Sequence, residues 1–246
     1  MRPVYTKPRY LVAGDSALMV EFGRAIDPAV NRRVQGFCAL LNGQAPAGVV
    51  EVIPSYRSVL ILYRPWELPL HALLGWLTRL EVMDPDPGPG RQLEIPVLYG
   101  GEWGPDLEEI ARFARLSPQE VVDIHTGSDY MVYCLGFAPG FPFLGKTPES
   151  IAMPRLATPR TRVPAGSVGI AGEQTGIYPS DSPGGWRLVG RTPLPLFLSH
   201  RDPPALFRPG DRVRLRAVGQ EEFLALQSRL QEEGPEALWE EVVLHP

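Results

Sequence analysis

The chain has 246 residues, which is enough for one large domain or two small ones. Its hydrophobic content of 44% and charged content of 21% are ordinary for a globular protein, and its formal net charge of -4 argues against general affinity for nucleic acid. The N-terminal residues lack the apolar core of a signal peptide, and no apolar run is long enough to span a bilayer. We therefore expect a cytoplasmic protein that binds neither nucleic acid nor membrane.

The first third of the chain has the pattern of a small α+β unit. Asp27 and Pro28 form a helix start, with an N-cap acid followed by proline at the first helical position. The expected elements are strands at 10–14 and 17–23, a helix from residue 28, strands at 48–55 and 58–64, and a helix at 68–82. This order predicts a split, ferredoxin-like sandwich, in which Pro54 confines the third strand to an edge or a bulge.

A Pro/Gly-rich segment divides the chain. Residues 83–92 hold three prolines and two glycines, which break helices and strands. We predict an N-terminal α+β domain at 1–83, a linker at 84–91 and a second domain at 92–246. The elements expected in the second domain are a strand at 93–100, helices at 105–115 and 117–125, strands at 130–135 and 211–218, and an acidic helical tail from residue 220.

The most informative stretch is 135–193, where glycines and prolines alternate with apolar residues. A disordered linker would not carry that much apolar surface. We expect an ordered all-β region with tight turns, whose loops could present polar side chains from a rigid scaffold.

Familiar catalytic motifs are missing from this stretch and from the rest of the sequence. GSVGIAG at 166–172 has no lysine and no strand-then-helix setting, so hairpin glycines are favoured over a phosphate loop. No G-x-S-x-G elbow is present, which leaves Ser167 a weak nucleophile. None of the four histidines has metal-ligand spacing, and Cys38 and Cys134 are expected to be buried thiols. The catalytic residues are not identified and no metal site is predicted.

Arginines beside prolines offer a binding chemistry. A guanidinium on a rigid loop suits bidentate recognition of carboxylate or phosphate, although such a side chain can also bond loop carbonyls. Gln174 and Tyr178 could orient an amide ligand or satisfy a polar core. His125 could enter the site, or its charge could be stabilised at a helix end. The predicted substrate- or partner-binding residues are His125, Arg155, Arg160, Gln174, Tyr178 and Arg191.

Three motifs carry a family resemblance. GFAPGFPFL, PR-x-x-x-PR-x-x-VPAGSVGIAG-x-QTGIYP and SPGGW-x-L-x-GRTP resemble the KipI family, whose members are also called PxpB, the B subunit of 5-oxoprolinase, or allophanate hydrolase subunit 1. The resemblance implies a cyclophilin-like β-barrel for the second domain and hence an α+β protein.

The resemblance also implies a function, that of the B subunit of an ATP-dependent 5-oxoprolinase. Such a complex hydrolyses the cyclic amide 5-oxoproline to glutamate, with a KipA/PxpC-like subunit and a PxpA-like subunit as partners. ATP with Mg is then expected at the level of the complex. Two alternatives remain: a KipI-type inhibitor of a sensor histidine kinase, and a carboxyltransferase-like module of a urea carboxylase/allophanate system.

Overall fold

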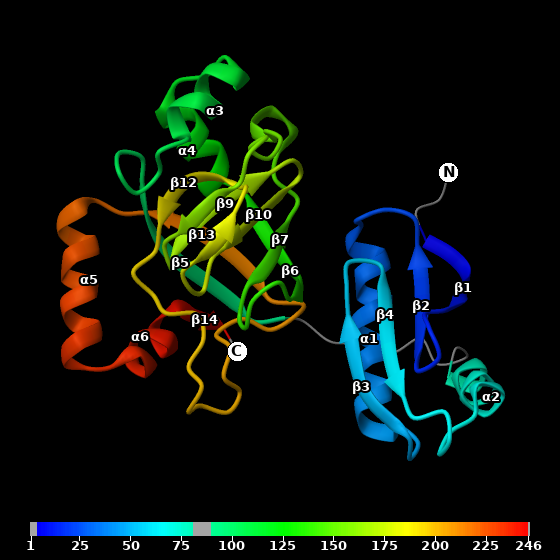
Figure 1. Cartoon of the computed structure of the whole chain (residues 1–246). Coiled ribbons are helices and arrows are strands. Elements are labelled where there is room, and N and C mark those ends of the chain that lie inside the picture. Colours follow the sequence, from blue (N-terminus) through cyan, green and yellow to red (C-terminus); the bar gives the residue numbers. More distant parts are fainter. Residues whose placement is uncertain (1–3, 81–89, 246) are drawn as a thin grey trace. The chain divides into compact units, whose positions relative to one another are not determined.

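The computed structural model of the chain describes residues 4–80 and 90–245 (Figure 1). Contacts divide the chain into two compact units, Met1–Pro89 and Gly90–Pro246. Of the predicted linker at 84–91, residues 84–89 lie outside the described residues.

The first unit is a four-stranded antiparallel sheet with two helices. Its elements are β1 (Val4–Val12), β2 (Ala17–Gly23), α1 (Pro28–Gln44), β3 (Val49–Pro54), β4 (Ser58–Tyr63) and α2 (Leu70–Leu80). The strand order is β1-β2-β4-β3, so Pro54 lies on an edge strand as predicted. The Asp27 carboxylate accepts a hydrogen bond from the Ala29 amide at 2.8 Å, which explains why α1 begins there. Leucines of α2 and apolar residues of α1 pack on the sheet in one core.

The second unit is built on a closed barrel. The barrel strands are β5 (Gln92–Tyr99), β6 (Asp129–Leu135), β7 (Pro142–Gly145), β9 (Ser167–Ala171), β10 (Gln174–Ile177), β12 (Arg187–Arg191) and β13 (Arg212–Ala217). They run in the order β12-β9-β10-β7-β6-β13-β5, and an additional β12–β5 pairing closes the ring. The predicted α+β fold with a barrel domain is thereby confirmed.

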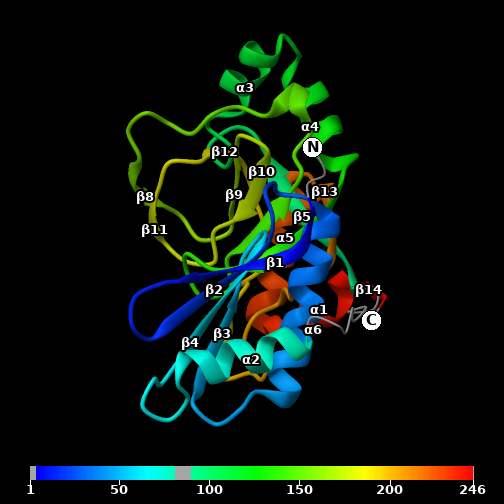
Figure 2. The ribbon, with the colours of Figure 1, turned by 90° about the vertical axis from the view of Figure 1, so that its right-hand side faces the viewer.

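A short two-stranded arm extends the barrel wall. It consists of β8 (Arg160–Val163) and β11 (Ser182–Gly184), which pair with each other and run side by side in Figure 2. The GSVGIAG stretch forms β9 and the start of the turn of the β9–β10 hairpin, in agreement with the hairpin interpretation. Gly166 has φ +80, and a Cβ there would lie 2.3 Å from the Thr192 carbonyl oxygen. That position therefore requires glycine.

Helices cover the barrel. They are α3 (Leu107–Ala114), α4 (Pro118–Thr126), the 3-10 turn η1 (Glu149–Ile151), α5 (Gln220–Glu232) and α6 (Pro235–Val242). The predicted start of α4 is confirmed by a capping box between Ser117 and Glu120. The tail from residue 220 is helical as predicted, but it forms two helices and ends in a short strand. Gly234 adopts φ +84 and Pro235 starts α6, so the helix is interrupted, and β14 (Val243–His245) then pairs with β5.

Candidate functional site

The six predicted binding residues fall into three groups in the second unit. Arg155 and Tyr178 line one pocket, Arg160 and Arg191 line another, and His125 and Gln174 line neither. We call the first the aromatic pocket; its lining residues are Phe137, Phe141, Phe143, Arg155, Tyr178, Gly184, Gly185 and Trp186. We call the second the arginine pocket; its lining residues are Glu102, Trp103, Pro105, Arg160, Arg162, Pro164, Ser167, Leu188 and Arg191.

The aromatic pocket has a volume of about 280 Å³ and walls made largely of aromatic rings. The buried Phe141 ring lines it, 5.3 Å from Tyr178 and 5.5 Å from Trp186 in edge-on contacts. The Arg155 guanidinium lies 5.7 Å from the centroid of Trp186, a cation–π distance. Burial raises the pKa of Tyr178, so its hydroxyl stays protonated at neutral pH.

Phe137 at the rim of the aromatic pocket has an unusual backbone. Its φ is +67, a conformation that residues with a side chain rarely adopt, and 66% of the residue is exposed. An exposed aromatic ring held on strained backbone is more typical of binding sites than of cores. The GFAPGF loop therefore places an exposed aromatic ring beside the pocket as well as forming a turn.

The arginine pocket is smaller, about 170 Å³. Arg191 donates from Nε to the Ala165 carbonyl at 2.7 Å, and its guanidinium lies 5.3 Å from the centroid of Trp103. Burial lowers the pKa of Arg191, with the nearby Asp181 carboxylate opposing this shift. Arg162 pairs with Asp181 at 2.7 Å on the exposed arm.

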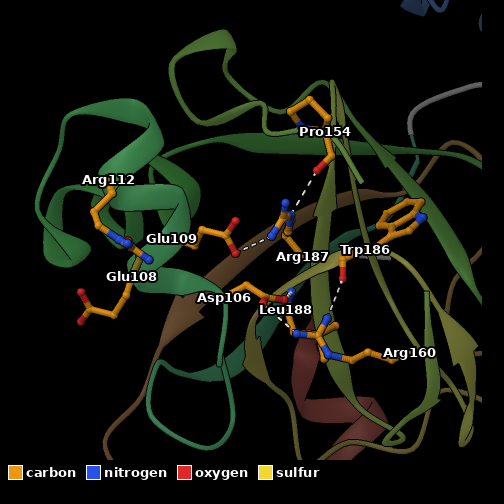
Figure 3. Close-up of polar contacts among 9 residues, drawn as sticks. All are labelled: Asp106, Glu108, Glu109, Arg112, Pro154, Arg160, Trp186, Arg187 and Leu188. Carbon is orange, nitrogen blue, oxygen red and sulfur yellow. Dashed lines mark hydrogen bonds and ion pairs between the residues drawn. The ribbon is translucent and has the colours of Figure 1, made fainter. Parts of the chain in front are cut away.

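Arg160 has a strong structural partner, shown in Figure 3. Its guanidinium donates to the Asp106 carboxylate at 2.7 Å, and the second Asp106 oxygen accepts the Leu188 amide at 2.7 Å. Neighbouring Arg187 pairs with Glu109 of α3 and donates to the Pro154 carbonyl at 3.3 Å. These bonds tie the start of α3 to β12 and to the loop before β8. They do not by themselves form a ligand site.

His125 lies in the core and outside both pockets. It is fully buried at the end of α4, with Nδ1 2.9 Å from the Tyr99 hydroxyl and Nε2 3.0 Å from the Thr175 hydroxyl. Because the Thr175 hydroxyl donates to the Gly169 carbonyl, it accepts from Nε2–H, and Nδ1 accepts from Tyr99. Burial lowers the pKa of His125 to about 3, so the ring is neutral and cannot use the charge stabilisation expected of a helix end.

Gln174 begins β10 at the hairpin turn, where its backbone pairs with Ala171 and Gly145. Sequence reasoning missed Trp103 and Asp106, which lie just after β5 and before α3. Asp106 had a local signal, since an acid at a helix start is often an N-cap, but its side chain makes no cap hydrogen bond. Its partner Arg160 is 54 residues away in sequence, and no local pattern reports that pairing.

Metal-ligand clusters and membrane-spanning helices are two other kinds of feature that the described residues could contain. Within 4–80 and 90–245, no group of three or more His, Cys, Asp or Glu side chains is arranged to hold a metal ion. None of the helices in that part of the chain is both long and apolar enough to cross a membrane.

Known proteins resemble this chain over most of its length. Residues 8–207 match the family described as "Carboxyltransferase domain, subdomain C and D". The B subunit of 5-oxoprolinase from Bacillus subtilis is 46% identical over 86% of this chain and 93% of its own length. The protein of the same name from Escherichia coli O157:H7 is 43% identical over 85% of this chain and 95% of its own. The chain belongs to the family of 5-oxoprolinase B subunits.

Solved structures agree on the fold of this family. The protein TTHA0988 is 39% identical, with a TM-score of 0.75 over 82% of this chain and 40% of that chain. This chain thus spans about 40% of that larger protein. The Kluyveromyces lactis urea amidolyase, at 23% identity, has a TM-score of 0.77 over 92% of this chain and 16% of its own, a likeness of fold alone. The fold of this chain therefore also occurs as part of longer chains.

Proposed function

We propose that this protein is the B subunit of an ATP-dependent 5-oxoprolinase, which opens the lactam 5-oxoproline to glutamate. The observation that carries the proposal is the similarity to proteins named as the B subunit of 5-oxoprolinase, at 46% and 43% identity over more than four fifths of this chain. The more distant urea amidolyase relatives reach 26% and 30% identity, so this interpretation is better supported than the carboxyltransferase alternative.

The proposed activity requires a complex. The name of the relatives refers to one subunit among several, and we propose a KipA/PxpC-like subunit and a PxpA-like subunit as the partners. Opening a lactam requires activation of the carbonyl carbon as well as a water nucleophile, and ATP with Mg supplies that activation in the complex. The described residues hold no cluster of acids fitted to a metal, so we assign no step of this chemistry to the chain.

The role that we assign to this chain is binding. The aromatic pocket offers apolar faces, the Arg155 cation and the protonated Tyr178 hydroxyl, which suit a small ring bearing polar groups. Arg155, Gln174, Tyr178 and Arg191 remain the predicted binding residues of a composite site, and Arg160 contributes to it through its ion pair with Asp106 at the wall of the arginine pocket. His125, the sixth predicted residue, would act on that site only indirectly, through its buried hydrogen bonds to Tyr99 and Thr175.

Co-expression tests this proposal. When the chain is produced together with a KipA/PxpC-like and a PxpA-like subunit, it should co-purify with them. The complex should consume 5-oxoproline only when ATP is present. The purified chain alone should show no turnover. Strong ATP-dependent hydrolysis by the isolated chain would refute the composite site, and an assembled complex inert toward 5-oxoproline would refute the proposed substrate.

A further inference from the structure

The arginine pocket contains a cation whose charge is not balanced by a direct ion pair. Arg160 is paired with Asp106 and Arg162 with Asp181, at 2.7 Å each. Arg191 forms no direct ion pair with a carboxylate in the described parts of the chain. Its Nε–H donates to the Ala165 carbonyl, and the nearby Asp181 carboxylate acts on the guanidinium only electrostatically. Its two terminal NH2 groups thus keep their donors for another acceptor.

The surroundings hold this guanidinium in a fixed orientation. Its Nε hydrogen bond and its contact with the Trp103 ring restrain the plane of the side chain. The Ala165 loop is itself fixed, because the Ala165 amide donates to Asp181 at 2.8 Å and the Gly166 amide donates to the Tyr178 carbonyl at 2.7 Å. Little conformational entropy would be lost when this arginine binds a ligand.

A second donor lies beside Arg191. Ser167 is its direct cross-strand partner between β9 and β12, so the two side chains lie on one face, and both line the pocket. The Ser167 hydroxyl makes no hydrogen bond within the described residues that would occupy it. A guanidinium edge next to a hydroxyl is a donor arrangement suited to carboxylate and phosphate oxygens.

We propose that the arginine pocket binds the oxyanion of a small ligand, either a carboxylate or a phosphate, through Arg191 and Ser167. The volume of about 170 Å³ lies below the usual range for drug-sized ligands, so it fits a small acid or one end of a larger molecule. Trp103, Pro105 and Leu188 supply the apolar walls. Glu102, which is exposed and lines the same pocket, is an opposing charge that weakens binding of an anion.

This inference deepens the proposed function and rests on it for the identity of the ligand. Both 5-oxoproline and its product carry a carboxylate, and ATP carries phosphates. The substrate carboxylate and the ATP phosphates would bind through the same anion chemistry. They are told apart by which free compound the isolated chain binds.

Calorimetric titration of the isolated chain tests the pocket without any turnover. The probes are 5-oxoproline, inorganic phosphate and ATP. Arg191→Met should lower the affinity for whichever probe binds by about tenfold or more, since a charge-assisted hydrogen bond is lost. Arg191→Lys should fall between that variant and the natural chain, because lysine keeps the charge without the planar fork. The control Arg208→Met, an exposed arginine that does not line the pocket, should bind as the natural chain does.

A second variant keeps the test informative if Arg191→Met folds poorly. Glu102→Gln removes the opposing charge and should tighten binding by about two- to fivefold. Binding of 5-oxoproline assigns the site to the substrate carboxylate, and binding of phosphate and ATP alone assigns it to a nucleotide.

The proposal is overturned if none of the three probes shows saturable binding, or if Arg191→Met and Glu102→Gln bind like the natural chain. If the assembled complex is active while these variants bind unchanged, this site is wrong and the proposed function stands. If a probe requires Arg191 but the complex does not open 5-oxoproline, the site stands and the proposed function fails.

Discussion

Arg160 and Arg191 have the same chemistry and line the same pocket, but their surroundings give them different roles. The Arg160 side chain is 28% exposed and bonded to an Asp106 side chain that is only 7% exposed. Arg191 donates to a backbone carbonyl and lies over an aromatic ring, while Asp181 acts on it electrostatically and no carboxylate in the described parts of the chain forms a direct ion pair with it. A partly buried ion pair mainly supports structure, whereas a restrained cation without an ion-pair partner is available to a ligand.

Asp106→Asn should therefore lower stability. The variant weakens the bond to Arg160 while retaining an acceptor for the Leu188 amide, and a charge-assisted hydrogen bond contributes about 1.5–3 kcal/mol. Urea denaturation of the purified chain measures the change. The matched control is Arg162→Gln, which breaks an ion pair with side chains 76% and 46% exposed and should change stability little. Equal losses in the two variants would contradict this assignment.

His125 should make stability depend on pH in mildly acidic solution. Its pKa is about 3 in the folded chain and near 6.5 when exposed, so the unfolded chain takes up a proton first as pH falls. The stability due to the neutral ring is complete above pH 6.5. Below that pH it decreases by about 1.4 kcal/mol per pH unit, until the pH approaches the folded pKa.

The variant His125→Gln isolates this effect. It should be less stable than the natural chain at pH 7, because the hydrogen bonds to Tyr99 and Thr175 are disturbed. That difference should narrow between pH 6.5 and pH 5, since only the natural chain loses the histidine contribution. Denaturation curves at the two pH values give the comparison, and a constant difference would show that His125 is not held neutral.

At the scale of elements, local signals predicted helix starts and the limits of some strands. Asp27 with Pro28, and Ser117 with Glu120, place hydrogen-bond acceptors where the first helical amides need them. Pro54 was correctly confined to an edge strand, because it has no amide for a ladder. The closure of the barrel through β12 and β5, the strand β14 and the burial of His125 depend on contacts between distant segments, which leave no periodic pattern.

For the site, the sequence predicted which arginines line a pocket but not which of them is held by a carboxylate. Residue type and neighbouring prolines identified Arg160 and Arg191, which do share a pocket. The acid that distinguishes them, Asp106, lies 54 residues from Arg160 in the sequence, so no local pattern could separate an arginine held in an ion pair from one without such a partner.

The closure of the barrel offers a test at this scale. Gly190 of β12 pairs with Tyr99 of β5, and a Cβ at Gly190 would lie 2.6 Å from the Leu98 carbonyl oxygen. Gly190→Ala should therefore force these strands apart and cost about 1–3 kcal/mol. Gly219→Ala is the control, because nothing lies within 4 Å of its added Cβ. A Gly190→Ala chain as stable as the control in chemical denaturation would mean that β12 and β5 are not in close contact.

At the scale of the whole molecule, the two units have separate hydrophobic cores. The first core joins β2, β4, α1 and α2 through residues such as Val20, Val34, Ile61 and Leu77. The second fills the barrel and the helices around it, with Ile95, Val132 and Val213 among its buried residues. Among residues 4–80 and 90–245, neither core includes a residue of the other unit. A core that is complete within one unit is the main condition for independent folding.

Residues 90–246 should accordingly fold alone. The fragment keeps all seven barrel strands, the α3 and α4 helices, both pockets and the Tyr99–His125–Thr175 network. We expect a soluble protein with one cooperative thermal transition and with the same oxyanion binding as the full chain, measured with the same probes. Insolubility, or the lack of a cooperative transition where the full chain has one, would show that the barrel depends on the first unit. A folded fragment that no longer bound a probe bound by the full chain would instead place part of that site outside residues 90–246.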